Sequence, residues 1–232
     1  MPSLRIVLVE PREAGNVGAV ARAMKNFAFR ELWIVGVHPQ LEPLAGWWAS
    51  GAEDVVREAR FAPSLAEAIG DAHMTVATTS TRGRVEPVDF DPRSLGETFS
   101  ALGEQTLALV FGREDRGLTS EEVAACQRTA SISTDPHSPV MNLAQSVCVF
   151  AYELSRVTPR PRARELASAE LVERAHHRAR ALLLDVGFLR DENPDAIYDD
   201  LRTIAGRADL DVREVTILLG ILRQLEWKLS SK

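Results

Sequence analysis

The fold can be inferred from one N-terminal stretch, Leu4-Arg-Ile-Val-Leu-Val-Glu10-Pro-Arg-Glu-Ala-Gly15-Asn16-Val-Gly18-Ala-Val-Ala-Arg22-Ala-Met24. The run from Leu4 to Glu10 is largely apolar and β-branched, which is typical of a buried strand. Apolar side chains then recur at helical spacing, and Asn16 is placed where it could cap that helix. The stretch therefore predicts a strand joined to a helix through a turn of small and polar residues, where backbone can approach a ligand.

Two further stretches have the same design. The second is Val110-Phe-Gly112-Arg-Glu114-Asp-Arg-Gly117-Leu118, and the third is Ser138-Pro-Val-Met141-Asn142-Leu143-Ala-Gln145-Ser146. One such turn would mean little. Three of them, in this order and in one small domain, predict a composite site for a nucleotide-like cofactor and a polar substrate.

The rest of the first two thirds of the chain predicts an α/β domain. Capping boxes at Ser64 and Thr119 open two short helices, and residues 82–103 predict a loop with at most a short helix. Strands alternating with helices indicate a mostly parallel sheet with helices on both faces. The expected strands, besides the first, are 32–37, a short one within 55–61, 74–78, 106–111 and 130–133.

The remaining third predicts a separate helical part. We expect a first domain over residues 1–157, a linker rich in proline and arginine over 158–169, and a C-terminal domain of three helices over 170–232. Asn193-Pro194 and the capping box that begins at Asp211 mark the starts of its second and third helices.

Composition excludes several classes of protein. The net charge of −6 argues against indiscriminate nucleic-acid binding, although arginines outnumber acids between residues 155 and 184 and acids dominate from 185 to 215. The two cysteines and five histidines lack the spacing of a metal site or a disulfide framework. No signal segment or membrane-length apolar run is present, so we expect a cytoplasmic protein without bound metal.

Each candidate residue also has a plain structural interpretation. Arg22 could be a solvated helix arginine, Glu114 part of an ordinary charged loop, and Asn142 only a helix cap. The segment from Gly15 to Gly18 lacks the G-x-G-x-x-G spacing of a dinucleotide-binding turn. The absence of a G-x-S-x-G elbow disfavours a serine hydrolase.

Taken together, the three motifs resemble those of the SPOUT superfamily of RNA methyltransferases, in its TrmH-like clade. The matching segments are Asn16-Val-Gly18-Ala-Val-Ala21-Arg22-Ala-Met24, Phe111-Gly112-Arg-Glu114 and Met141-Asn142-Leu143. The N-terminal Glu10-Pro and the C-terminal Ile217-Leu-Leu-Gly-Ile-Leu-Arg-Gln-Leu225 look like the TrmJ subgroup, which methylates cytidine or uridine on the 5′ side of the tRNA anticodon loop. The resemblance implies a C-terminal trefoil knot in the α/β domain, S-adenosylmethionine as cofactor, and a homodimer with sites at the subunit interface.

The resemblance also assigns the site residues. The catalytic arginine would be Arg22, supported by Asn16, Glu114 and Asn142. Arginine is effectively always protonated, so we expect Arg22 to clamp a phosphate and stabilise a developing alkoxide rather than to act as a base. The residues expected to hold the cofactor are Thr79, Ser80, Thr81, Gly112, Ile132, Pro139, Val140 and Met141.

Two departures from the family pattern bear on function. Many relatives place serine where this chain has Val140, and the helical tail is acidic around Tyr198-Asp-Asp200, where a tRNA-binding surface would be basic. The expected phosphate contacts are the linker between Arg156 and Arg164, together with Arg12, Lys25, Arg82, Arg84, Arg113 and Arg116.

The sequence thus predicts an S-adenosylmethionine-dependent RNA 2′-O-methyltransferase that acts on the ribose of an anticodon-loop cytidine or uridine of the nucleotide 32 type. Its partners would be tRNA and a second copy of the chain, with no membrane. The alternatives are a ribosomal-RNA ribose methyltransferase and a non-catalytic RNA-binding scaffold, the latter favoured by Val140 and the acidic tail.

Overall fold

A computed structural model describes residues 2–80, 88–157, 166–189 and 194–230. The chain forms two compact units, Met1–Arg162 and Ala163–Lys232. The first unit contains all the described residues of the three motifs, and the second contains the helical tail.

The first unit is built on a six-stranded sheet in the order β3-β2-β1-β5-β4-β6, with every neighbouring pair parallel. Parallel pairing places the carboxyl ends of all strands at one edge, which is where loops of α/β proteins form sites. The strands are β1 (Ser3–Val9), β2 (Glu31–Val35), β3 (Arg60–Ala62), β4 (Met74–Thr78), β5 (Thr106–Phe111) and β6 (Arg128–Ala130).

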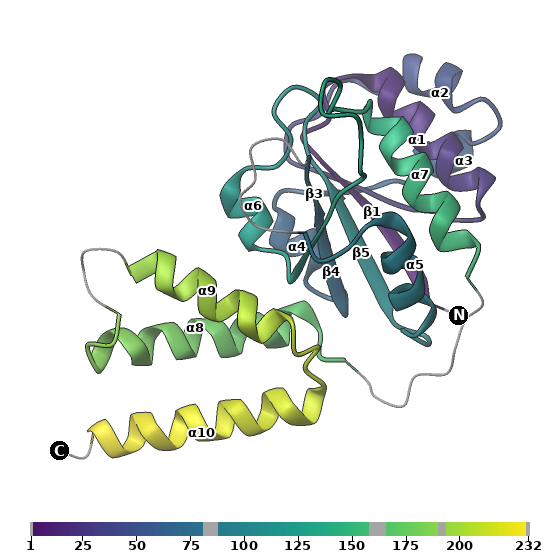
Figure 1. Ribbon diagram of the computed structural model, residues 1–232. Coiled ribbons are helices and arrows are strands. Elements are labelled where there is room, and N and C mark those ends of the chain that lie inside the picture. The colour runs from purple at the N-terminus through teal and green to yellow at the C-terminus, as the bar shows by residue number, and fades with distance from the viewer. Residues whose placement is uncertain (1, 81–87, 158–165, 190–193, 231–232) are drawn as a thin grey trace. The chain divides into compact units, whose positions relative to one another are not determined.

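Helices cover both faces of this sheet, as predicted (Figure 1). One face packs on α4 (Leu65–Ile69) and the region of α6 (Ser120–Ala124), through a buried cluster that includes Val7, Val9 and Val110. The other face is covered by helices that contact one another, and Phe150 meets Phe111 edge-to-face there, with ring centroids 5.9 Å apart. These helices are α1 (Ala14–Asn26), α5 (Pro92–Ser100) and α7 (Leu143–Ser155), with α2 (Leu44–Ala49) and α3 (Glu53–Arg57) packed beside α1.

Several local predictions differ from the structure. Within 55–61, residues up to Arg57 belong to helix α3, and the expected short strand begins only at Arg60 and runs to Ala62. The strand expected at 130–133 lies at 128–130 instead. Within 82–103, Asp91 and Ser94 form a capping box that opens the nine-residue helix α5. Asn16 does not cap α1, because that helix begins at Ala14, so the capping prediction was wrong.

The second unit consists of α8 (Ala169–Asp185), α9 (Pro194–Gly206) and α10 (Val212–Ser230), with α9 and α10 each packed against α8. The capping box predicted at Asp211 is present, since Glu214 N donates to its carboxylate at 2.8 Å and Asp211 N donates to Glu214 at 2.9 Å. The core includes Val172 and Val215, and a bidentate pair joins Glu173 to Arg202 between α8 and α9.

The half-buried His176 of α8 makes the stability of this unit depend on pH. Burial, followed by the nearby charge of Arg202, lowers the pKa of His176 to about 4 from 6.5. Below pH 6.5 the unfolded chain binds a proton at His176, whereas the folded chain binds it only near pH 4. The contribution of the neutral His176 to the free energy of unfolding is therefore lost as pH falls from 6.5 toward 4.

We predict that His176→Phe, which retains an aromatic ring and removes the titration, reduces the loss of unfolding free energy between pH 7 and pH 4.5 by about 1–3 kcal/mol. Denaturant unfolding of the full chain, followed by circular dichroism at both values, measures the difference. His177→Gln is the matched control, because His177 is more exposed than His176. Equal pH dependence in wild type and His176→Phe would contradict the assignment.

Candidate functional site

The three motifs meet at the carboxyl edge of the sheet. β1 leads into the loop before α1, its neighbour β5 leads into residues 112–118, and the third motif leads into α7. The chain thus brings together residues that lie more than a hundred positions apart in the sequence, such as Asn16 and Asn142.

Glu114 holds the loop before α1 in place. Its carboxylate accepts from the backbone amides of Arg12 and Glu13, at 2.9 and 3.2 Å, and from the Asn16 side-chain amide at 2.9 Å. Burial raises the pKa of Glu114, but these hydrogen bonds outweigh burial, so the pKa lies below its ordinary value. The carboxylate is therefore ionised near neutral pH, and both its oxygens are occupied by donors.

Asn16 connects this carboxylate to the third motif. Its Oδ1 accepts from Asn142 Nδ2 at 3.0 Å, while the Asn142 Oδ1 caps α7 by accepting from Ala144 N at 2.8 Å. One hydrogen-bonded chain, Glu114–Asn16–Asn142, thus contains a residue from each motif. Asn16 lies within the first turn of α1, where its side chain makes this link instead of capping the helix.

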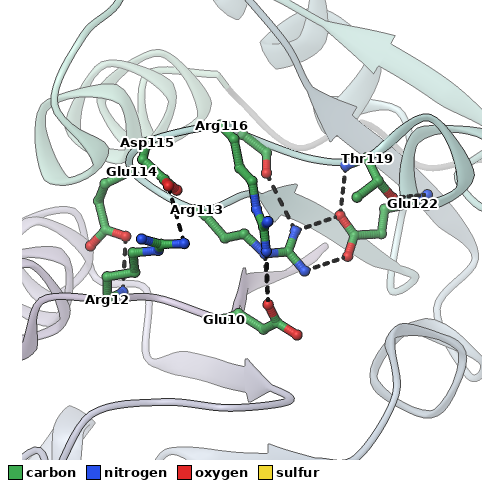
Figure 2. Close-up of polar contacts among 9 residues, drawn as sticks. Glu10, Arg12, Arg113, Glu114, Asp115, Arg116, Thr119 and Glu122 are labelled. Atoms are coloured by element: carbon green, nitrogen blue, oxygen red, sulfur yellow. Dashed lines mark hydrogen bonds and ion pairs between the residues drawn. The ribbon is translucent and has the colours of Figure 1, made fainter.

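A second, more buried network lies next to the first (Figure 2). The Arg113 guanidinium donates to Glu10 at 2.7 Å and to both oxygens of Glu122 at 2.9 Å, and its side chain is 6% exposed. Glu122 and then Glu10 raise the pKa of Arg113. The hydrogen bond from Arg113 lowers the pKa of Glu10. For Glu122, burial opposes the effect of Arg113, yet the pKa still lies below its ordinary value.

The Arg113 network joins three segments of the chain. Glu10 ends the β1 segment with a φ of 44°, a conformation that residues with side chains rarely adopt. Glu122 also completes the capping box of α6 with Thr119. Sequence reasoning missed the roles of Glu10 and Glu122, although the capping box itself was recognisable.

The glycines of the motifs have a packing role. A Cβ built on Gly112 would lie 2.1 Å from the carbonyl carbon of Gly117 and 2.2 Å from Leu118 N, so the loop can fold back only over a glycine. A Cβ on Gly18 would lie 2.1 Å from the Ala45 carbonyl oxygen, where α1 meets α2. The protein's own packing therefore accounts for both glycines without a cofactor.

Arg22 is exposed on α1. Among the residues that the structure describes, none forms a hydrogen bond or ion pair with its guanidinium. The guanidinium of Arg22 is therefore free to contact a ligand. Arg113, which the sequence suggested as a phosphate contact, is instead buried and paired with carboxylates of the protein. Lys25, another suggested contact, is paired with Asp54 at 2.7 Å.

The residues expected to hold the cofactor lie just beyond β4, β5 and β6. Ala77 is paired with Val110 and Thr78 with Ala130, so continuing each register by two residues places Thr79 level with Gly112 and Ser80 level with Ile132. Next to Ile132, the hydroxyl of Ser131 is buried and has no partner among the described residues. A buried hydroxyl without a partner at this edge is consistent with a polar group binding there.

The third motif supplies the other expected cofactor contacts. The Pro139 carbonyl accepts from Thr134 Oγ1 at 3.1 Å, Met141 is half-buried, and Val140 is 60% exposed. Thr81, Arg82 and Arg84, together with the linker arginines from 160 to 164, lie outside the described residues. Over the described ranges, no group of His, Cys, Asp or Glu could hold a metal ion, and no helix has the length and apolarity needed to cross a membrane.

Comparison with known proteins places the chain in a family. Residues 3–152 match the SpoU rRNA Methylase family, and residues 170–232 match the C-terminal domain of tRNA methyltransferase TrmJ. The TrmJ protein of Salmonella typhimurium, named a tRNA (cytidine/uridine-2′-O-)-methyltransferase, is 35% identical over 97% of each chain. The crystal structure of TrmJ from Z. mobilis ZM4 has a TM-score of 0.84 and 32% identity, covering 97% of this chain and 99% of its own.

A more distant structure shares the fold of the first unit. AviRb from Streptomyces viridochromogenes, solved in complex with the cofactor AdoMet, has a TM-score of 0.54 and 22% identity over 66% of this chain and 60% of its own. The sheet, the three motifs and the matches to both units define an RNA methyltransferase with a helical C-terminal region. The chain belongs to the SpoU rRNA Methylase family and, within that family, to the TrmJ group.

The three hydrogen bonds to the Glu114 carboxylate lead to a testable prediction. In Glu114→Gln, an amide NH₂ would face at least one of the three N–H donors, so we expect a loss of about 1–3 kcal/mol in the free energy of unfolding. Because the first turn of α1, which carries Asn16, would shift, turnover should also fall by about 10- to 100-fold.

Asp115→Asn is the matched control, because that neighbouring carboxylate makes an exposed ion pair with Arg12 at 3.1 Å. Methyl transfer and denaturant unfolding of both variants test the difference. If Glu114→Gln behaved like Asp115→Asn, the positioning role of Glu114 would be refuted.

Proposed function

We propose that the protein transfers the methyl group of S-adenosylmethionine to the ribose 2′-hydroxyl of a cytidine or uridine in a tRNA anticodon loop, at the position of nucleotide 32. The observation that carries the proposal is the hydrogen-bonded chain Glu114–Asn16–Asn142, which unites all three motifs in the unit that also carries the exposed Arg22. The name of the Salmonella relative supports both the tRNA substrate and the 2′-oxygen as the acceptor.

The proposed cofactor contacts are the loops after β4, β5 and β6, and the third motif. S-adenosylmethionine, when bound, supplies an already activated methyl group on a sulfonium. Thr79, Ser80, Gly112 and Ile132 would approach it through the backbone, with the Ser131 hydroxyl available for a polar contact. The segment from Pro139 to Met141 would complete the contacts, with Val140 offering no hydroxyl.

The protein's remaining task is to align and activate a weak nucleophile. A guanidinium is a cation with five N–H donors and no acceptor, so Arg22 would hold the neighbouring phosphate and stabilise the alkoxide that develops on the ribose. Asn16 and Asn142 would fix the loop and helix starts around the sugar, with Glu114 holding Asn16. The hydroxyl proton would pass to a phosphate or to water. Orientation of this kind can supply about 7 kcal/mol or more of the reduction in barrier.

The proposal includes three structural expectations. A trefoil knot at the C-terminal part of the α/β domain is proposed from the resemblance to SPOUT methyltransferases, which the match to the SpoU family supports. A homodimer with sites at the subunit interface is proposed from the same resemblance. A tRNA substrate would place the enzyme in the cytoplasm.

Mapping of the modified nucleotide tests the function directly. We expect radiolabelled methyl groups to enter tRNA but not ribosomal RNA, and the label to map to a 2′-O-methylated pyrimidine in the anticodon loop. Labelling of ribosomal RNA instead would favour the alternative that the SpoU family description suggests. Absence of any transfer, with RNA binding intact, would favour the scaffold alternative, which the exposed Val140 and the acidic segment around Tyr198 support.

The role of Arg22 is tested by Arg22→Lys. Lysine keeps the charge but loses the planar set of donors, so we expect turnover to fall by about 100-fold or more while the dissociation constant for S-adenosylmethionine changes little. Single-turnover kinetics and calorimetry measure the two quantities. Arg93→Lys is the control, an exposed arginine on α5 whose partner Glu97 is 3.9 Å away. Near-normal turnover in Arg22→Lys would refute the proposed role of Arg22 in holding the phosphate and stabilising the alkoxide.

A further inference from the structure

Two adjacent tryptophans on α2 are turned outward from the fold. Trp47 is 72% exposed and Trp48 is 60% exposed, and both lie in a helix of only six residues. An exposed pair of large aromatic side chains is unusual on a protein surface unless something covers it. The mechanism described above uses neither side chain.

The short helix that carries these indoles is firmly anchored. Ala45 and Ala49 are fully buried against the body of the unit. The backbone of Ala45 approaches α1 so closely that a Cβ on Gly18 would lie 2.1 Å from the Ala45 carbonyl oxygen. Because α2 is held in this way, its two tryptophans lie on the outer surface of the unit, and the pair Trp47 and Trp48 is here called the tryptophan platform.

The tryptophan platform adjoins the candidate site. The Trp48 indole lies over the first turn of α1, where a Cβ on Gly15 would be 3.1 Å from its Cδ1 and Nε1 atoms. The next residue is Asn16, the centre of the hydrogen-bonded chain that links the motifs. Arg22 follows Gly15 by seven positions, so it projects from nearly the same side of α1, about 10 Å farther along the helix axis.

We propose that the tryptophan platform stacks bases of the substrate RNA next to the nucleotide whose ribose is methylated. This inference rests on the proposed function and identifies a surface that would read single-stranded RNA. A nucleotide offers a flat π-face and a phosphate, and the surface offers two indole faces with an unpaired guanidinium on the adjoining helix. Charge complementarity argues for RNA as the occupant, because the exposed guanidinium of Arg22 has no partner among the described residues and would match a phosphate next to the stacked bases.

The physical reason is that stacking on an aromatic ring is open to bases that are not already stacked in a duplex. Bases of single-stranded loops are then held on aromatic side chains, and each stacked base contributes strongly to affinity regardless of its identity. Rigid indoles lose little conformational freedom on binding. The platform would therefore contribute to affinity for a loop and little to affinity for a duplex.

Binding measurements with whole tRNA test the proposal. We expect Trp48→Ala to weaken binding of fluorescently labelled tRNA by about fivefold to a hundredfold, and Trp48→Phe, which keeps a ring, by no more than about threefold. Leu44→Ala is the matched control, because Leu44 lies on the same helix, is 48% exposed and has no ring. Affinity for an RNA duplex and for S-adenosylmethionine should be the same in all variants.

Three results would overturn the proposal. Equal tRNA affinity in wild type and Trp48→Ala is one, and equal weakening by Leu44→Ala and Trp48→Ala is the second. The third is a change of oligomeric state in Trp48→Ala, seen by sedimentation, because it would show that a second copy covers the surface. If wild type transferred no methyl group but Trp48→Ala still lost tRNA binding, the proposed function would fail while the platform remained supported.

Discussion

The site depends on one buried guanidinium. Arg113 holds the end of β1 through Glu10, the start of α6 through Glu122, and its own loop through the carbonyl of Gly117. These contacts fix the distance between the first and second motifs. This fixed distance allows the next residue, Glu114, to accept hydrogen bonds from the backbone amides of the loop before α1. Because removal of one partner from a buried ion pair costs about 3–5 kcal/mol, this arrangement resists the shifts that would separate the motifs.

Much of the fold follows from residues that are close in sequence. The apolar runs of β4 and β5 gave the observed strand boundaries, since buried parallel strands need apolar side chains on both faces. The capping box at Thr119 placed the start of α6 correctly, because both of its hydrogen bonds are local. The misplaced β6 is a three-residue strand at the sheet edge, where position is set by pairing with β4 and by contacts remote in the sequence.

The site was less predictable, for a related reason. Asn16 stands where a cap is expected, yet it binds Glu114 and Asn142, which a local pattern cannot reveal. Arg113 and Arg22 look alike as charged residues within motifs, and the structure buries the first and leaves the second exposed. Gly112 shows the converse. A glycine is required at position 112 because the backbone of Gly117 lies too close for a Cβ. The presence of glycine there was therefore weaker evidence for a cofactor than the pattern suggested.

The chemistry available to the four residues assigned to catalysis is narrow. Asn16 and Asn142 are neutral amides, and an arginine such as Arg22 offers only hydrogen-bond donors and no acceptor. Glu114 is ionised, but both of its oxygens accept hydrogen bonds from the protein and its pKa is lowered, so it is a poor proton acceptor. None of the four is therefore suited to remove the proton of a ribose hydroxyl. If these residues form the catalytic site as proposed, the rate enhancement would come from orientation and from the positive charge of Arg22, and the hydrogen bonds that hold the motif loops in place would serve that orientation.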